Sequence, residues 1–228
     1  MSKTDKVTDW EFSKLFESAR HGSSAFETWQ AFVYMAAYDI ANAVCQDVSP
    51  FRDIAETLSN KYDTGTMAAL FSNLVESYEE NPYRDLMGDT YMRLGIGNKA
   101  GGQFFTPYHV CRLMADSIMA EQDVNEKIDE NGYITVLEPS CGSGANVVAA
   151  CERLNRLGVN YQERLFAWAN DVSEVTALMC YVQLSLIGCP AVVSVGDTLK
   201  MEYRYALKTP VLMTGSIWAA RRMRGFEW

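Results

Sequence analysis

The segment from Tyr133 to Gly144 reads Tyr-Ile-Thr-Val-Leu-Glu-Pro-Ser-Cys-Gly-Ser-Gly and decides the fold class. Its first five residues are β-branched, aromatic or aliphatic, which is typical of a short buried strand. A glycine-containing turn follows, and the run from Ala145 to Leu157 then has apolar residues at helical spacing. The segment predicts a strand, a tight turn and a helix, which together form the opening unit of an open α/β sheet.

The same alternation continues towards the C-terminus. Strands are expected at 164–169 and 191–195, with a helix at about 173–187 between them. Strands that alternate with helices pair in parallel through right-handed crossovers. We therefore expect residues 126–228 to form a truncated, Rossmann-like parallel sheet. Pro210-Val-Leu-Met213 is interpreted as a fourth strand at its edge.

Residues 1–125 are predicted to form a helical N-terminal domain. Capping-box patterns at Thr8–Glu11 and Ser24–Glu27 indicate two helix starts. A further helix is expected at about 83–94. The glycine-rich stretch 95–105 is typical of a loop, and Thr106-Pro107 resembles an N-cap with proline at the first helical position.

The composition and charge of the chain exclude several classes of protein. The net charge of −9 argues against a surface coated in basic patches for nucleic acid. Residues 200–228 carry six Lys/Arg against two Glu, a net +4, and could contact phosphate or an acidic partner. We find no apolar run long enough to span a bilayer and no secretory signal. The six cysteines lack metal-ligand spacing, so we expect reduced thiols, no metal and a cytoplasmic protein.

Three predicted strand ends carry groups suited to a nucleoside ligand. The glycines after the first strand allow close approach to the backbone and precede free helix N–H groups. Asp171 could accept both ribose hydroxyls, and the neighbouring Val172 could pack on a flat base. Asp197 could accept a hydrogen bond from an adenine amino group.

The choice of cofactor depends on the first turn. Val147 occupies the position of the third glycine in the dinucleotide fingerprint. Glu138 would repel a pyrophosphate but suits the ammonium of an amino acid. These features favour S-adenosylmethionine over a nicotinamide cofactor. A turn that binds nothing, and a dinucleotide-binding enzyme, remain the alternatives.

Four segments extend this interpretation to a family. Gly102-Gln-Phe-Phe-Thr-Pro107, Glu138-Pro-Ser-Cys-Gly-Ser-Gly144, Asn170-Asp171 and Gly196-Asp-Thr-Leu199 occur in the order seen in amino-group DNA methyltransferases. Over about residues 80–200 the chain resembles the modification subunit of type I restriction–modification systems. The resemblance implies an S-adenosylmethionine-dependent, DNA adenine-N6 methyltransferase-like protein. The cofactor-binding residues that the resemblance and the strand ends indicate are Gln103, Phe104, Phe105, Thr106, Pro107, Glu138, Ser140, Cys141, Gly142, Ser143, Gly144, Asp171, Val172, Asp197 and Thr198.

The chain departs from that family at the expected catalytic motif. The family places Asn-Pro-Pro-Phe/Tyr after the fourth strand, where it binds the target amine and stacks on the flipped base. Here Thr214-Gly-Ser-Ile217 follows the predicted strand, and Asn81-Pro82-Tyr83 is interpreted as a turn. No residue is therefore assigned a catalytic role, and independent methylation is not expected.

The missing catalytic motif also affects which partners are expected. The alternative function is a noncatalytic cofactor-binding or assembly protein that works with a partner chain. DNA would be contacted through a complex. Trp218, Phe226 and Trp228 are unusually apolar for a free tail, so we expect residues 200–228 to be covered by the helical domain, a protein partner or a second copy.

Overall fold

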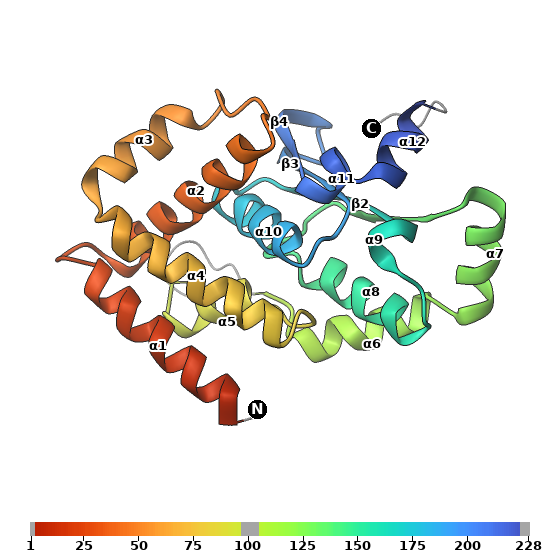
Figure 1. Ribbon diagram of the computed structural model, residues 1–228, viewed down its shortest axis with the longest axis horizontal. Coiled ribbons are helices and arrows are strands. Elements are labelled where there is room, and N and C mark those ends of the chain that lie inside the picture. Colours follow the sequence, from red (N-terminus) through yellow and green to blue (C-terminus); the bar gives the residue numbers. More distant parts are fainter. Residues whose placement is uncertain (1–2, 97–104, 224–228) are drawn as a thin grey trace.

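A computed structural model describes residues 3–96 and 105–223 of the protein (Figure 1). Helices precede the first strand in sequence. They are α1 (Lys3–Ala19), α2 (Ala25–Ala43), α3 (Arg52–Lys61), α4 (Thr64–Glu80), α5 (Leu86–Arg93), α6 (Tyr108–Ile118) and α7 (Glu121–Asn131).

The second half contains a four-stranded sheet in the order β1-β2-β3-β4. Its strands are β1 (Ile134–Glu138), β2 (Leu165–Asp171), β3 (Ala191–Asp197) and β4 (Glu202–Lys208). The helices of this half are α8 (Ala145–Arg156), α9 (Tyr161–Arg164), α10 (Glu174–Leu186), α11 (Pro210–Thr214) and α12 (Ser216–Met223). The expected α/β class and its first three strands are confirmed.

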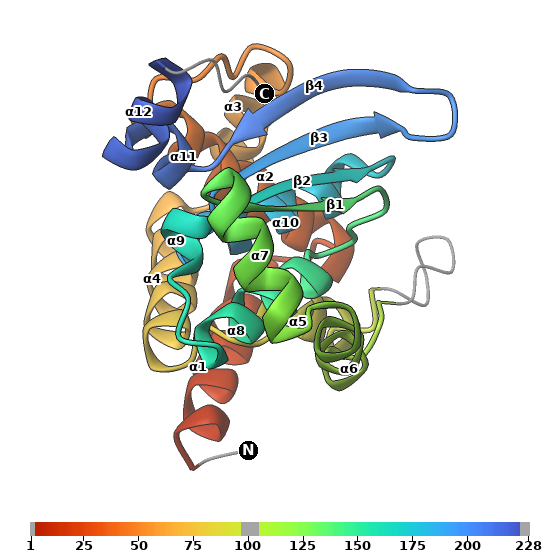
Figure 2. The same ribbon diagram turned by 90° about the vertical axis from the view of Figure 1, so that its right-hand side faces the viewer.

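The expectation of a wholly parallel sheet is wrong. β1, β2 and β3 are mutually parallel, but β4 pairs antiparallel with β3. Figure 2 shows the arrowheads of β2 and β3 on one side and that of β4 on the other. The chain turns back at 198–201 because a hairpin satisfies the free edge of β3 without a crossover helix. The alternation Tyr203, Tyr205, Leu207 was the available signal for this strand.

The predicted strand at 210–213 is also wrong, because this segment is helix α11. Pro210 occupies its first turn, where a missing N–H costs nothing. The Thr209 hydroxyl accepts from Ala191 N–H at 2.9 Å and donates to Cys189 carbonyl at 2.6 Å. These bonds hold α11 at the amino end of β3, so a strand at this point is replaced by a turn of helix.

The observed helix N-termini agree only in part with those predicted from the sequence. Ser24 and Glu27 form the expected capping box at α2. Thr8 lies inside α1, which already begins at Lys3. Asp85 caps α5, three residues beyond Pro82, and Pro107 rather than Thr106 is the N-cap of α6. The side chains of Asp85 and Ser24 accept backbone N–H groups, which explains why those two boundaries are sharp.

Buried side chains of the two halves form one continuous hydrophobic cluster. α2 packs along α10, and Trp29 Nε1 donates to Met179 Sδ at 3.3 Å across that contact. Both side chains are fully buried. The helical half and the sheet therefore share one hydrophobic core.

Within the described residues, no helix has the length and apolar character to cross a membrane.

The tail packs against the protein's own chain. On β4, Tyr205 stacks on Phe51 of the helical half, with ring centroids 5.8 Å apart. Trp218 of α12 is buried instead against Phe166 and Tyr133, on the opposite face of the sheet. Phe226 and Trp228 lie outside the described residues.

Candidate cofactor site

A hollow of about 320 Å³ opens at the carboxyl ends of the parallel strands. Seven of the residues that sequence reasoning selected line it: Phe105, Thr106, Ser140, Cys141, Gly142, Ser143 and Asp171. Cys111, Ala145, Asn146 and Thr176 complete the lining. The structure thus brings the Phe-Thr-Pro segment, the glycine turn and the end of β2 together from three separate parts of the chain.

The turn between β1 and α8 requires its glycines. Gly142 has φ +54 and Gly144 has φ +99, both in the left-handed region. A Cβ on Gly142 would lie 3.0 Å from Phe105 Cδ1, and one on Gly144 would lie 2.9 Å from Cys180 Sγ. The turn is therefore pressed between the Phe-Thr-Pro segment and α10. Phe105 in turn packs on Tyr91 of α5, with ring centroids 5.3 Å apart.

Asp171 links the end of β2 to this turn. Its Oδ2 accepts Gly142 N–H at 2.9 Å, while its Oδ1 accepts Ser173 N–H at 2.9 Å and Thr176 Oγ1 at 3.0 Å. Each carboxylate oxygen has two lone pairs, so Oδ2 keeps one free for a ligand hydroxyl. The carboxylate both shapes the turn and faces the hollow.

Asn170 joins the ends of the three parallel strands. Its Nδ2 donates to Gly196 carbonyl at 2.9 Å and to Thr198 Oγ1 at 2.6 Å. Its Oδ1 accepts Ser194 Oγ at 2.9 Å, and Thr198 Oγ1 donates to Pro139 carbonyl at 2.8 Å. Because Asn170 is almost fully buried, these bonds fix the spacing of the turns that follow β1 and β3.

A second buried network ties the helical half to the glycine turn. Ser143 Oγ donates to Asp85 Oδ2 at 2.8 Å, and Gly88 N–H donates to Asp85 Oδ1 at 3.0 Å. Gln183 Nε2 donates to Asp85 Oδ1 at 3.2 Å and to Ser143 carbonyl at 3.0 Å. Tyr78 Oη donates to Gln183 Oε1. Burial raises the pKa of Asp85 to about 6, against the lowering effect of its hydrogen-bond donors.

Glu138 and Asn146 stand where β1 meets α8. Asn146 Nδ2 donates to Glu138 Oε2 at 2.8 Å, and Ser140 N–H approaches Glu138 Oε1 at 3.3 Å. Asn146 Oδ1 is buried and has no hydrogen-bond partner within the described part of the chain. A buried acceptor without a donor at the wall of a hollow fits a ligand that supplies an N–H or O–H group.

The thiols of the hollow are not nucleophiles. Burial raises the pKa of Cys111 to about 11. Contact with the Cys180 thiol, together with burial, raises the pKa of Cys141 well above its usual range. Both groups are therefore protonated at neutral pH and act as packing. In the ranges 3–96 and 105–223, no cluster of three His, Cys, Asp or Glu side chains could hold a metal ion.

The other selected residues that the structure describes lie around the hollow rather than in its lining. Gln103 and Phe104 fall outside the described residues. Val172 is 69 % exposed at the end of β2. Asp197 Oδ1 accepts Leu199 N–H at 3.0 Å and Lys200 N–H at 3.2 Å, and these backbone bonds, chiefly that of Lys200, lower its pKa. Pro107, Glu138, Gly144 and Thr198 hold the neighbouring turns.

Sequence reasoning missed several residues that shape the site. Asp85, Asn146, Thr176 and Gln183 all contact the turn or the strand ends. Asn146 and Thr176 each lie early in a helix that follows a strand, a position that faces the carboxyl edge of the sheet and could have singled them out. Asp85 and Gln183 are far from the turn in sequence, so only the packing of α5 and α10 reveals them.

The segment Thr214–Ile217 lies at the wrong end of the sheet for chemistry at this hollow. Trp218 Nε1, just beyond it, donates to Gln162 carbonyl at 2.8 Å. Arg221 contacts the carbonyls of Glu163 and Gly132, close to the starts of β2 and β1. The segment therefore belongs to the amino ends of the strands, and its suggested position after a fourth strand is corrected.

Comparison with known protein families gives a match over most of this part of the chain. The family model described as N-6 DNA Methylase matches residues 83–217, which is more than half of the chain. The chain belongs to the N-6 DNA methylase family. The matched range begins just before Asp85 and contains the Phe-Thr-Pro segment, the glycine turn and the four strands.

A curated relative gives the same result. The type I restriction enzyme MjaIX methylase subunit of Methanocaldococcus jannaschii is 25 % identical over 190 residues, which covers 78 % of this chain and 31 % of the relative. This N-6 DNA methylase family member thus spans about a third of the length of that subunit. No solved structure matches the chain.

Proposed function

We propose that this chain is the S-adenosylmethionine-binding part of a DNA adenine-N6 methylase and that it acts with a partner that supplies the acceptor-base site. The observation that carries the proposal is the convergence of Phe105, Gly142 and Asp171 on one hollow. Its volume lies at the lower end of the roughly 300–1,000 Å³ typical of ligand pockets.

The residues present fit this cofactor. Glu138 is suited to an amino-acid ammonium, for which the unpartnered Asn146 Oδ1 offers a second acceptor. Asp171 is suited to the ribose hydroxyls, and Val172 and Asp197 to the adenine at the rim. The resemblance to the family implies that Gln103 to Pro107 contact the methionine end. When bound, the cofactor supplies an electrophilic methyl group; this chain contributes binding, orientation and exclusion of water.

The chain is expected not to methylate DNA alone. An exocyclic amine needs oriented acceptors and a base out of its stack needs an aromatic partner, as the Asn-Pro-Pro-Phe/Tyr motif provides. Loss of one oriented transition-state contact costs about 10²–10³-fold in rate. Thr214–Ile217 does not replace the motif, because it lies at the amino ends of the strands. DNA contact through a restriction–modification type complex and a cytoplasmic location remain predictions.

Calorimetric titration with S-adenosylmethionine tests the binding role. Asp171→Ala should weaken binding by about 1.5–3 kcal/mol, the scale of hydrogen bonds to a charged group. Ile54→Ala, at a 43 % exposed position on α3 outside the lining of the hollow, should leave affinity unchanged. Tighter binding of NAD than of S-adenosylmethionine, or unchanged binding in a folded Asp171→Ala protein, would remove the assignment.

A separate assay tests the catalytic part. Pure chain, methyl-labelled cofactor and mixed-sequence duplex should yield no labelled adenine. Label at ordinary enzymatic rates would contradict the need for a partner and would show that an unidentified residue replaces the motif. A chain that binds the cofactor but does not methylate DNA is expected for both the proposed role and the alternative role as a noncatalytic assembly protein. Repeating the assay with the partner added distinguishes the two roles.

A further inference from the structure

A hollow of about 660 Å³, here called the helical hollow, lies between α2, α3 and α4 in the N-terminal half. α3 and α4 each pack against α2 but make little contact with one another, and Figure 1 shows α2 between them. A space therefore remains over α2 where the two outer helices diverge. Its volume is within the roughly 300–1,000 Å³ typical of ligand pockets and about twice that of the cofactor hollow.

Most of the lining of the helical hollow is apolar, and part of it is aromatic. Phe32 of α2 and Met67 of α4 are almost fully buried and belong to the main hydrophobic core. The partly buried rings of Tyr38 and Phe71 line the same space from α2 and α4. Apolar walls favour the apolar body of a small molecule, and aromatic rings also attract organic cations.

The charged side chains that line the helical hollow are all negative. The lining contains Asp39 of α2 and Glu56 of α3 but no Lys, Arg or His. Among the residues that the structure describes, neither carboxylate has a hydrogen-bond donor or an ion-pair partner. Burial raises the pKa of Asp39 above its ordinary value, as expected for a carboxylate beside apolar surface without a nearby cation. Both carboxylates are therefore available to a positively charged ligand.

We propose that the helical hollow binds a small organic ammonium ion with an apolar body. The ammonium lies at the two carboxylates, and the body packs against the aromatic rings. An anionic ligand would be repelled, and an uncharged apolar ligand would cover the carboxylates without compensating their lost water. A bare metal ion fits poorly, because no cluster of three acidic, His or Cys side chains occurs within 3–96 and 105–223.

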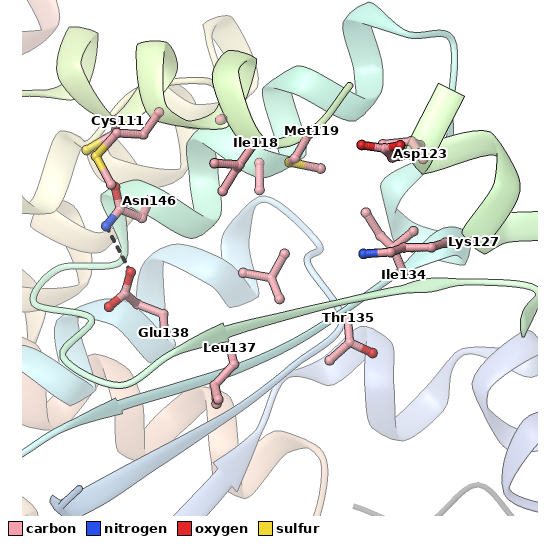
Figure 3. A pocket seen from close by; sticks show the side chains of 15 residues that line it. Cys111, Ile118, Met119, Asp123, Lys127, Ile134, Thr135, Leu137, Glu138 and Asn146 are labelled. Atoms are coloured by element: carbon pink, nitrogen blue, oxygen red, sulfur yellow. Dashed lines mark hydrogen bonds between the residues drawn. The ribbon is translucent and has the colours of Figure 1, made fainter. Parts of the chain in front are cut away.

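Another apolar hollow of the chain differs in its charge. It is about 280 Å³, lies beside β1, and contains Lys127 as well as Asp123 and Glu138 (Figure 3). Glu138 also accepts a hydrogen bond from Asn146, which is drawn as a dashed line in Figure 3. The negative charge in that smaller hollow is thus partly balanced by groups of the chain itself. The helical hollow has no such balance, and this favours a cationic ligand there.

The helical hollow is separate from the cofactor hollow. The two have no lining residue in common. S-adenosylmethionine also carries an ammonium, but next to it stands a carboxylate that Asp39 and Glu56 would repel. The ammonium site is therefore a second ligand site, and it does not depend on the proposed function.

The probe is 4-phenylbutylamine, which is protonated at neutral pH and carries an aromatic body. Two matched compounds keep the body and change the end: 4-phenyl-1-butanol is neutral and 4-phenylbutyrate is an anion. Binding to the full chain is measured by saturation-transfer NMR and calorimetry at low salt, where exposed charges are least screened. We expect the amine to bind with a dissociation constant of about 1 mM or below, the alcohol about tenfold more weakly, and the anion not measurably.

Variants place the probe in the helical hollow. Asp39→Asn combined with Glu56→Gln should weaken amine binding about tenfold, to the level of the alcohol. Ala68→Trp fills the hollow from an exposed position on α4 and should abolish binding of both compounds. Glu76→Gln combined with Glu79→Gln removes the same charge from exposed positions of α4 outside the lining and should leave affinity unchanged.

Several outcomes would overturn the proposal: no amine binding by the parent chain, equal binding of amine and alcohol, or an equal loss in the control pair. Displacement of the amine by S-adenosylmethionine would do the same, because it would place the probe in the cofactor hollow. Asp39 and Glu56 are exposed helix positions, so their double variant keeps the test decisive if Ala68→Trp does not fold. Titration of S-adenosylmethionine without the amine tests the cofactor role separately.

Discussion

The two ends of the sheet are closed in different ways. At the amino ends of the strands, Trp218 packs on Phe166 and Tyr133, and Arg221 lies 4.5 Å from the Trp218 ring centroid. At the carboxyl ends, Asn170 donates to the Gly196 carbonyl and Ser143 donates to the Asp85 carboxylate, and these hydrogen bonds hold the turns. The amino end of the sheet is covered by packed apolar side chains, here called the seal. The turns at the carboxyl end are held by hydrogen bonds.

This difference suggests that the amino end of the sheet contributes mainly to stability and the carboxyl end mainly to ligand binding. Apolar burial is non-directional and contributes mainly to the free energy of unfolding. Buried hydrogen-bond networks contribute less net stability but fix atoms to a defined geometry. The amino end therefore acts as a seal, and the carboxyl end keeps an ordered, partly open surface at which a ligand can be held.

The largest effect is expected when the seal is removed. Trp218→Ala should lower the free energy of unfolding by about 3–5 kcal/mol, the usual cost of deleting a large buried side chain. Cofactor affinity of the folded fraction should not change, since the carboxyl end is untouched. Chemical denaturation measures the first and calorimetry the second. Leu199→Ala, 98 % exposed, is the control; a loss below about 1 kcal/mol in Trp218→Ala would mean that α12 contributes no seal.

An intermediate effect is expected from pH at the carboxyl end. Burial raises the pKa of the Asp85 carboxyl from its ordinary value of 3.8 to about 6 in the folded chain. Its stabilising contribution is complete below pH 3.8 and is lost as pH rises through about 6. Two pKa units correspond to about 3 kcal/mol.

The measurement is the difference in unfolding free energy between the parent chain and Asp85→Asn. That difference should fall between about pH 4 and 6 and stay flat above 7. Subtracting the variant removes the titration of other carboxyl groups. A difference that grows with pH would show that the donors from Gly88, Ser143 and Gln183 outweigh burial.

The smallest effect is expected from one bond of that network. Ser143→Ala removes the donor to Asp85 Oδ2 and should cost about 1–2 kcal/mol of unfolding free energy at neutral pH. It should also weaken S-adenosylmethionine binding, since Ser143 lines the hollow. The double variant with Asp85→Asn should cost less than the sum of the two single changes. Strict additivity would mean that the two side chains do not act together.

Much of the fold could be predicted from local pattern. The strands β1 to β3, helices α8 and α10, and the capping box of α2 each follow from short stretches with a clear period or cap. Strand β4 was missed because the hairpin uses only a weak alternation between polar residues. The segment 210–214 was misread because a short apolar run suits a strand and a helix equally well.

By itself, the sequence determined the α/β class, the glycine turn and the place of Asp171, because each belongs to a local pattern whose position relative to a strand end is fixed. The selection of Phe105 and Thr106 came from the resemblance to the amino-group DNA methyltransferases. The tertiary structure alone decided that Asp85 and Gln183 hold Ser143 and that Trp218 packs at the opposite end of the sheet. These features join residues remote in sequence, and their pairing depends on how helices pack on the sheet rather than on any local period.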